Sequence, residues 1–74
     1  MEITIHNTDR LVTIDGLPAR IWEGQTASGI PVHCYVTRIA VAVDQDAGEF
    51  ARELAETRPL SAALDAAIPA RLVL

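Results

Sequence analysis

The fold is decided by residues 11–22, which read LVTIDGLPARIW. The central pair, Asp15-Gly16, lies between two runs in which apolar residues alternate with others. Both residue types tolerate the positive φ angle that a two-residue type I′ hairpin turn requires. This stretch therefore predicts two antiparallel strands joined by a tight turn, with Val12 opposite Ala19.

Two further loops extend this hairpin into a larger sheet. Residues 7–10 (NTDR) and residues 25–28 (QTAS, flanked by Gly24 and Gly29) have the composition of four-residue hairpin loops. Closing the chain at all three turns predicts a four-stranded antiparallel meander whose apolar side chains share one face. The predicted cross-strand pairs are Ile5–Val12, Val12–Ala19, Ala19–Cys34, Ile3–Ile14 and Ile21–Val32.

The fourth strand of this meander is predicted to be long. Its apolar residues alternate from Ile30 to Val36, and the alternation resumes in residues 38–43 with the opposite phase. We therefore expect a bulge or bend near Thr37. Because residues 38–43 extend past the neighbouring strands, they need another strand beside them. We expect that strand to be either the C-terminal run, residues 71–74, or part of a second copy of the chain.

Two helices are predicted in the second half of the chain. Asp46 followed by Glu49 forms a capping box that opens the first helix, and Pro59 ends or kinks it. A second, alanine-rich helical stretch covers residues 60–67. Each helix carries an apolar stripe at helical spacing: Ala47, Phe50, Ala51, Leu54 and Ala55 on the first, and Leu60, Ala63, Leu64 and Ala67 on the second. The expected fold is one α+β domain over residues 1–74, consisting of the four-stranded meander and a short C-terminal strand, with one face covered by one or two helices.

The composition argues against several classes of protein. The net charge is −4, and the six basic residues are dispersed arginines that form no basic stripe, so a nucleic-acid partner is not expected. The longest apolar run, residues 39–43, is far shorter than the ~20 residues of a membrane helix, and no signal-peptide pattern precedes the first strand. A single cysteine fits a reducing compartment. We therefore expect a cytoplasmic protein that does not bind membranes, and twelve alanines without any lysine favour a bacterial or phage origin.

No metal, cofactor or catalytic set is predicted. In the predicted register His6 and His33 share a face but are two intervening strands apart, about 14 Å, which is too far for one metal ion. Cys34 is predicted to pack in the core beside Ala19 as a small hydrophobic residue. The acidic run at residues 44–49 lacks the ligand and glycine positions of a calcium loop.

One face of the predicted sheet carries residues typical of a binding surface. The single tryptophan and the single tyrosine point away from the predicted core, and Trp, Tyr and Arg are enriched where proteins bind one another. Two alternative roles for these side chains stay open: the second helix covers them, or they stabilise an exposed sheet as cross-strand aromatic residues. The candidate interaction surface consists of Arg20, Trp22, Pro31, His33 and Tyr35, and its predicted cross-strand pairs are Trp22–Pro31, Arg20–His33 and Pro18–Tyr35.

The small size of the chain favours a partner. A domain of 74 residues buries little surface, and proteins of this size often add a disulfide, a metal or a second subunit. We expect a small non-catalytic protein-interaction or assembly module that forms a homodimer through the outer sheet face or through residues 38–43. The alternative is a small enzyme or ligand-binding subunit whose site lies between two protomers and uses His33, Arg20 and Tyr35. A third possibility is an acidic inhibitor or a nucleic-acid mimic.

Overall fold

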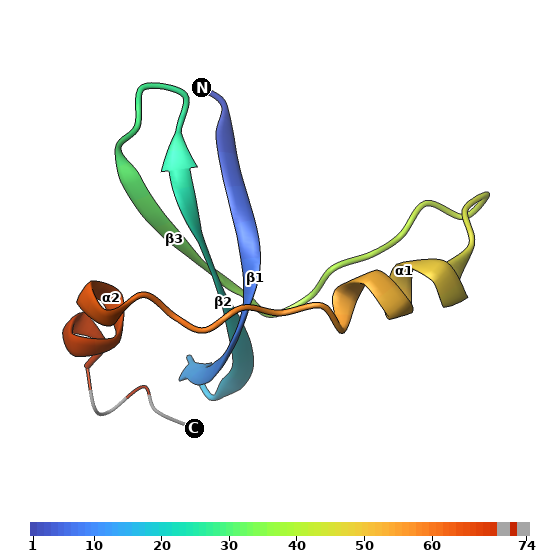
Figure 1. Cartoon of the computed structure of the whole chain (residues 1–74). Coiled ribbons are helices and arrows are strands. Elements are labelled where there is room, and N and C mark those ends of the chain that lie inside the picture. The colour runs from blue at the N-terminus through green and yellow to red at the C-terminus, as the bar shows by residue number, and fades with distance from the viewer. Residues whose placement is uncertain (70–71, 73–74) are drawn as a thin grey trace.

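The computed structural model describes residues 1–69 and Leu72, and it shows one antiparallel sheet with two short helices (Figure 1). The elements, in chain order, are β1 (Ile3–Ile14), β2 (Leu17–Thr26), β3 (Pro31–Val36), α1 (Ala47–Leu54) and α2 (Ala62–Ala67). The strands lie side by side in the order β1-β2-β3. The predicted α+β class with an antiparallel sheet is confirmed, but the sheet formed by the described residues has three strands and not four.

The predicted turn at Asp15-Gly16 is confirmed. Both residues have positive φ angles, 51° and 78°, as a type I′ turn requires. The two strands that meet at this turn are in the expected register, with Val12 opposite Ala19.

The predicted loop at residues 7–10 does not form, and β1 runs through this segment as one twelve-residue strand with a bulge. Asn7 and Thr8 are buried at the bulge. Asn7 Nδ2 donates a hydrogen bond to the carbonyl oxygen of Leu54 (2.7 Å), and Thr8 Oγ1 donates one to the carbonyl oxygen of Ile21 (2.6 Å). These bonds pair Asn7 Nδ2 and Thr8 Oγ1 inside the structure, so the segment does not need to turn toward solvent. Asn7 Oδ1 is buried without a hydrogen-bond partner. Two predicted pairs are wrong because both members of each lie in β1: Ile5–Val12 and Ile3–Ile14.

The pairing of β3 with β2 is shifted by three residues from the prediction. β2 continues through Thr26, and the turn that follows contains Gly29 with a φ of 89°. The hydroxyl oxygen of Thr26 accepts a hydrogen bond from the backbone N–H of Ile30 (3.1 Å), which fixes the turn at this position. Because three is an odd number, the shift exchanges the two faces of β3 relative to β2. The predicted pairs Ala19–Cys34 and Ile21–Val32 are therefore wrong: Cys34 lies opposite Trp22, and Tyr35 lies opposite Ile21.

One face of the sheet is covered by α2 and the segments that flank it, and we call it the covered face. Its buried centre consists of Val12, Ala19 and Ile21. The second predicted helix therefore forms and packs against the sheet as expected. Five partly buried apolar residues pack against this centre: Ile14, Leu60, Leu64, Ile68 and Leu72.

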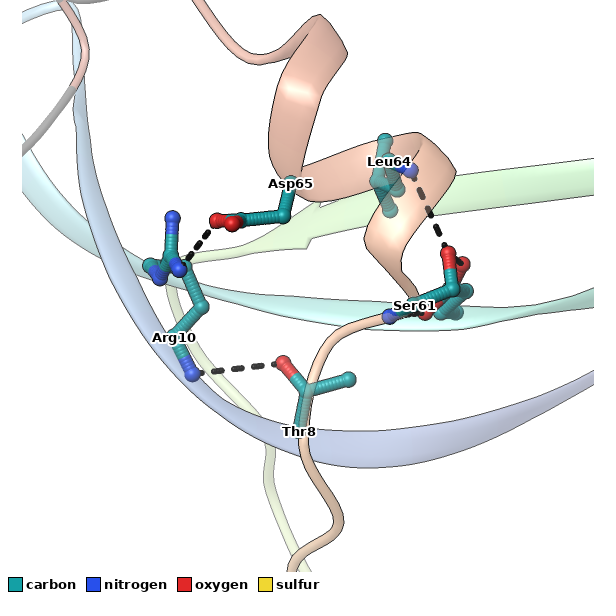
Figure 2. A network of polar contacts seen from close by, with 6 residues as sticks. Thr8, Arg10, Ser61, Leu64 and Asp65 are labelled. Atoms are coloured by element: carbon teal, nitrogen blue, oxygen red, sulfur yellow. Dashed lines mark hydrogen bonds and ion pairs between the residues drawn. The ribbon is translucent and has the colours of Figure 1, made fainter.

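Polar contacts fasten α2 to two strands (Figure 2). Ser61 caps the helix, since its Oγ accepts a hydrogen bond from the backbone N–H of Leu64 (3.3 Å). Glu23 of β2 in turn accepts hydrogen bonds from the backbone N–H (3.0 Å) and the hydroxyl of Ser61. Arg10 of β1 forms an ion pair with Asp65 of α2. The helix is thus held to the sheet at its first turn and again at its middle.

The first predicted helix is capped as expected but does not cover the sheet. The carboxylate of Asp46 accepts hydrogen bonds from the backbone N–H groups of Gly48 (2.9 Å) and Glu49 (3.1 Å). In α1 no residue is buried, and the helix lies on the other side of the sheet from α2, pointing away from the strands (Figure 1). Its C-terminal end stays close to β1, where Leu54 accepts the hydrogen bond from Asn7. The predicted packing of its apolar stripe against the sheet is therefore wrong.

The predicted long fourth strand ends early. The chain bends at Thr37, as expected, but β3 stops at Val36, and residues 38–46 form no strand. Isolated strands need a neighbour to pair their backbone groups, and no described segment lies beside this one as a strand. The predicted C-terminal strand, residues 71–74, lies outside the described residues except for Leu72.

Candidate interaction surface

The sheet has a second face, opposite the one that α2 covers. Residues directly opposite each other on neighbouring antiparallel strands share a face. Asn7, Trp22 and Cys34 form one such row across the three strands. We call this side the Trp22 face. Its apolar side chains are Ile3, Ile5, Leu11, Trp22, Val32, Cys34 and Val36, and Arg20 lies among them.

The five residues of the predicted interaction surface do not lie together. Arg20 and Trp22 lie on the Trp22 face, whereas Pro31, His33 and Tyr35 lie on the covered face. The shift of β3 is the cause, because it exchanges the faces of β3 while those of β2 stay as predicted. Three predicted cross-strand pairs are consequently wrong: Trp22–Pro31, Arg20–His33 and Pro18–Tyr35.

The residues that replace them beside Trp22 are Val32, Cys34 and Val36, which the sequence prediction placed in the core. The alternation of this strand was interpreted correctly, but the loop before it was placed too early. The hydroxyls of Thr26 and Ser28, which lie 3.2 Å apart in the observed turn, are the signal that locates it. Serine and threonine hydroxyls bond to the backbone of turns, so a turn beginning at position 26 was recognisable in principle.

The Trp22 face is apolar and partly open. Ile3 is 42% exposed and Leu11 is 41% exposed, while the side chains of Trp22, Cys34 and Val36 are half-buried. An antiparallel sheet that has one solvated face normally presents polar residues on it. Apolar residues on both faces are instead typical of a sheet that packs between two layers.

A groove lies at one end of the Trp22 face, where β3 passes into the next segment. Its volume is about 180 Å³. Arg20 is held beside it by a hydrogen bond from its Nη1 to the carbonyl oxygen of Thr8 (2.9 Å). Two arginines and no acidic residue line the groove, so it favours an occupant that is both apolar and negatively charged. The lining residues are Arg20, Trp22, Val36, Thr37, Arg38, Ile39 and Leu54.

Residues 37–56 form an arm that leaves the sheet after β3 and carries α1. The chain returns to the sheet at Arg58, which pairs with β1 in parallel: its N–H donates to Asn7 (3.2 Å), and its carbonyl accepts from Asp9 (3.1 Å). Both ends of the arm are therefore fixed at the sheet. The arm is acidic overall, with five carboxylates, Asp44, Asp46, Glu49, Glu53 and Glu56, against two arginines, Arg38 and Arg52.

The apolar side of the arm is uncovered along much of its length. Val41 and Phe50 line a shared hollow between the two limbs of the arm, and Ile39 and Val43 are exposed. Leu54 is the last residue of the apolar stripe of α1, and it also lines the groove. The apolar surface of the arm is thus continuous with that of the Trp22 face.

The covered face ends in a polar row. Glu23 has His6 opposite it on β1 and His33 opposite it on β3. A single strand therefore lies between the two histidines, whereas the sequence predicts two intervening strands. The hydrogen bonds from Ser61, and then the charge of His33, lower the pKa of the Glu23 carboxyl. His33 Nε2 and the hydroxyl of Tyr35 lie within hydrogen-bond distance (3.0 Å), and their rings meet edge to face. The carboxylate at the centre of the row is thus already bonded to the start of α2.

The polar row borders a cavity, but the residues of the enzyme alternative are divided between the two faces of the sheet. The cavity has a volume of about 410 Å³ and is lined by His6, Glu23, Arg58 and Ser61 among others. Across residues 1–69 and 72, no three His, Cys, Asp or Glu side chains form a group that could hold a metal ion. Arg20 lies on the opposite face from His33 and Tyr35, so one chain does not bring together the three groups of the enzyme alternative.

None of the helices in the described part of the chain is long and apolar enough to cross a membrane. Comparisons of the chain with protein-family models, with curated proteins and with solved structures found no match. The Trp22 face and the arm are therefore the features from which a function can be inferred.

Proposed function

We propose that this protein is a non-catalytic assembly module that binds a protein partner, in the first place a second copy of itself, through the Trp22 face and the arm. The observation that carries the proposal is the amount of surface that one chain exposes. That surface is 5476 Å², whereas a folded monomer of 8.0 kDa exposes about 4,450 Å². The excess of about 1,000 Å² resembles the ~800 Å² that each partner contributes to a stable interface.

The dimensions of the chain support the same proposal. The radius of gyration is 13.4 Å, whereas a compact domain of 74 residues has about 11.3 Å. Half of the residues are hydrophobic, yet in the described part of the chain the fully buried hydrophobic centre is limited to Val12, Ala19 and Ile21. A second subunit that covers the Trp22 face would supply the apolar burial that the single chain lacks.

A reducing compartment suits this module. Cys34 is a free, half-buried thiol on the Trp22 face, and reducing conditions would keep it from forming disulfides with other chains. We therefore place the protein in the cytoplasm. The alanine-rich, lysine-free composition favours a bacterial or phage source.

Sedimentation of the full chain over a range of concentrations tests the proposal. We expect a species with twice the mass of one chain, and a melting temperature that rises with protein concentration, because association stabilises the folded state by mass action. Trp22→Ala should weaken the dimer at least about thirtyfold, as expected for a central aromatic residue of an interface. A monomer at all concentrations, with stability independent of concentration, would contradict self-association.

Tyr35→Ala is the matched control. Tyr35 is also a large aromatic residue in the sheet, but it lies on the covered face and is 37% exposed. Its removal should leave the dimer affinity within about twofold of the parent, since the side chain lies outside the proposed interface. If the Tyr35 variant lost the dimer and the Trp22 variant kept it, the interface would lie on the other face.

A further inference from the structure

We infer that the layer covering the Trp22 face is the arm of a second copy, and that two chains exchange their arms about a two-fold axis. This inference rests on the proposed self-association, but it makes a separate claim about which two surfaces meet. In such a dimer, α1 of each chain lies across the sheet of the other. An interface with two-fold symmetry is self-complementary, so each chain must carry both halves of the contact.

The charges of the two surfaces are complementary. Arg20 and Arg38 line the groove, and no acidic residue lies among its lining side chains. Glu49 forms an ion pair with Arg52 within α1, so Glu53 is the carboxylate of this helix outside that pair. An acidic amphipathic helix placed against a groove with two arginines gains both apolar contact and charge attraction.

The lengths of the two surfaces also match. α1 has eight residues, which gives a helix of about 12 Å. The three strands of the sheet span about 10 Å from β1 to β3. One such helix is therefore long enough to cross the Trp22 face from edge to edge.

The chain's own arm is held away from this position. Asn7 Nδ2 bonds to the carbonyl oxygen of Leu54, and Arg58 is paired with β1. These contacts fix the C-terminal end of α1 beside the sheet while the rest of the helix points away from it (Figure 1). For the arm to cover its own sheet, α1 would have to turn about this fixed end. Docking on a second copy requires no such change.

Disulfide trapping tests the arm exchange, because Cys34 is the single cysteine of the chain and lies beside Trp22 on the Trp22 face. Chains with the native Cys34 are mixed with tagged chains that carry Cys34→Ala and Ala51→Cys, where Ala51 belongs to the apolar stripe of α1. Under mild oxidation we expect a mixed disulfide between position 34 of one chain and position 51 of the other, since a disulfide forms where Cα atoms approach within about 7 Å. Peptide mapping identifies the link. Arg52→Cys, on the polar side of the same helix, is the matched control and should link much more slowly.

The possible outcomes separate this inference from the proposed function. A dimer in sedimentation without the 34–51 link would overturn arm exchange and leave self-association intact, whereas a strict monomer would overturn both. A chain that carries both Cys34 and Ala51→Cys supplies a further outcome. If its link formed within one chain, the arm would fold onto its own sheet, which also overturns the exchange.

Charge reversal gives an independent measurement that needs no oxidation. Arg38→Glu should weaken the dimer about threefold, the size expected for a partly exposed charge pair. Adding Glu53→Arg should restore the affinity in the double variant, because the pair is then present with its signs exchanged. If Glu53→Arg weakened the Arg38→Glu dimer further, or if Arg38→Glu had no effect, the helix would not lie against the groove.

Discussion

The two faces of this sheet carry similar numbers of apolar residues but differ in how those residues are covered. On the covered face, α2 is capped by Ser61, bonded to Glu23 and paired with Arg10, and apolar residues fill the space beneath it. On the Trp22 face, α1 is equally well capped, by Asp46, but one hydrogen bond from Asn7 joins it to the strands. The difference shows that good local helix chemistry does not by itself make a packed layer.

The contrast also identifies where the stability of the single chain resides. Contacts on the covered face are made within one chain and join segments that are far apart in sequence, so they stabilise the single chain. The apolar residues of the Trp22 face lack such contacts and contribute to stability when a second layer is added. Substitutions on the two faces should therefore differ in whether their effects depend on protein concentration.

The largest expected effect comes from Ile21→Ala. Ile21 is completely buried on the covered face, and it is the chain neighbour of Trp22 on the other. Truncation leaves a cavity and should lower the free energy of unfolding by about 2–5 kcal/mol. Urea unfolding at two protein concentrations measures this loss. For the monomeric species, the loss in the free energy of unfolding should be the same at both concentrations. A loss that vanished at high dilution would instead place Ile21 in the dimer contact.

The sequence predicts one half of this comparison well. The turn at Asp15-Gly16 fixes β1 against β2 by local φ preferences, and Asp46 starts a helix through hydrogen bonds to backbone N–H groups. The predicted end of that helix at Pro59 is wrong, because α1 ends at Leu54, five residues earlier. Such signals act over a few residues, so they can be recognised without knowing the rest of the fold. They gave the α+β class, the hairpin and the existence of both helices.

The candidate surface was harder to predict because it depends on long-range contacts. Residues 7–10 have the composition of a loop, yet the side chain of Asn7 donates a hydrogen bond to the backbone carbonyl of Leu54, 47 positions away. Gly24 resembles the edge of a turn, but it lies within β2, where a Cβ atom would come 1.8 Å from the carbonyl oxygen of Thr4. A three-residue error in the following hairpin was then enough to exchange the faces of β3 and to divide the predicted surface.

A smaller loss in the free energy of unfolding is expected when a helix cap is removed. Removing the cap of α2 and the cap of α1 in turn compares the two helices directly. Ser61→Ala removes the cap of α2 and its hydrogen bond to Glu23, so the free energy of unfolding should fall by about 1–2 kcal/mol. Asp46→Ala removes the equivalent cap of α1, which is not packed on its own sheet. In dilute, monomeric protein its cost to the global unfolding transition should be below about 0.5 kcal/mol, while helical circular dichroism decreases. Equal losses for the two variants would mean that α1 belongs to the same cooperative unit as the sheet.

The smallest expected effect is a pH dependence of the covered face alone. The pKa of Glu23 in the folded chain is lowered below its usual 4.5, first by the hydrogen bonds from Ser61 and then by His33. The folded state therefore binds a proton less readily than the unfolded state at this group, so its contribution to stability is present above pH 4.5 and is lost as the pH falls through the folded pKa.

Unfolding measured between about pH 3 and pH 6 should show this loss, and Glu23→Gln should flatten that part of the curve. Arg10 and Asp65 form an ion pair in the same layer, and the difference between parent and Glu23→Gln isolates the contribution of Glu23. Glu53→Gln removes one carboxylate from α1 and is the control: it should leave the pH dependence of the monomer's free energy of unfolding unchanged. If Glu53→Gln flattened the curve as much as Glu23→Gln, the acid response would not arise from the contact between α2 and the sheet.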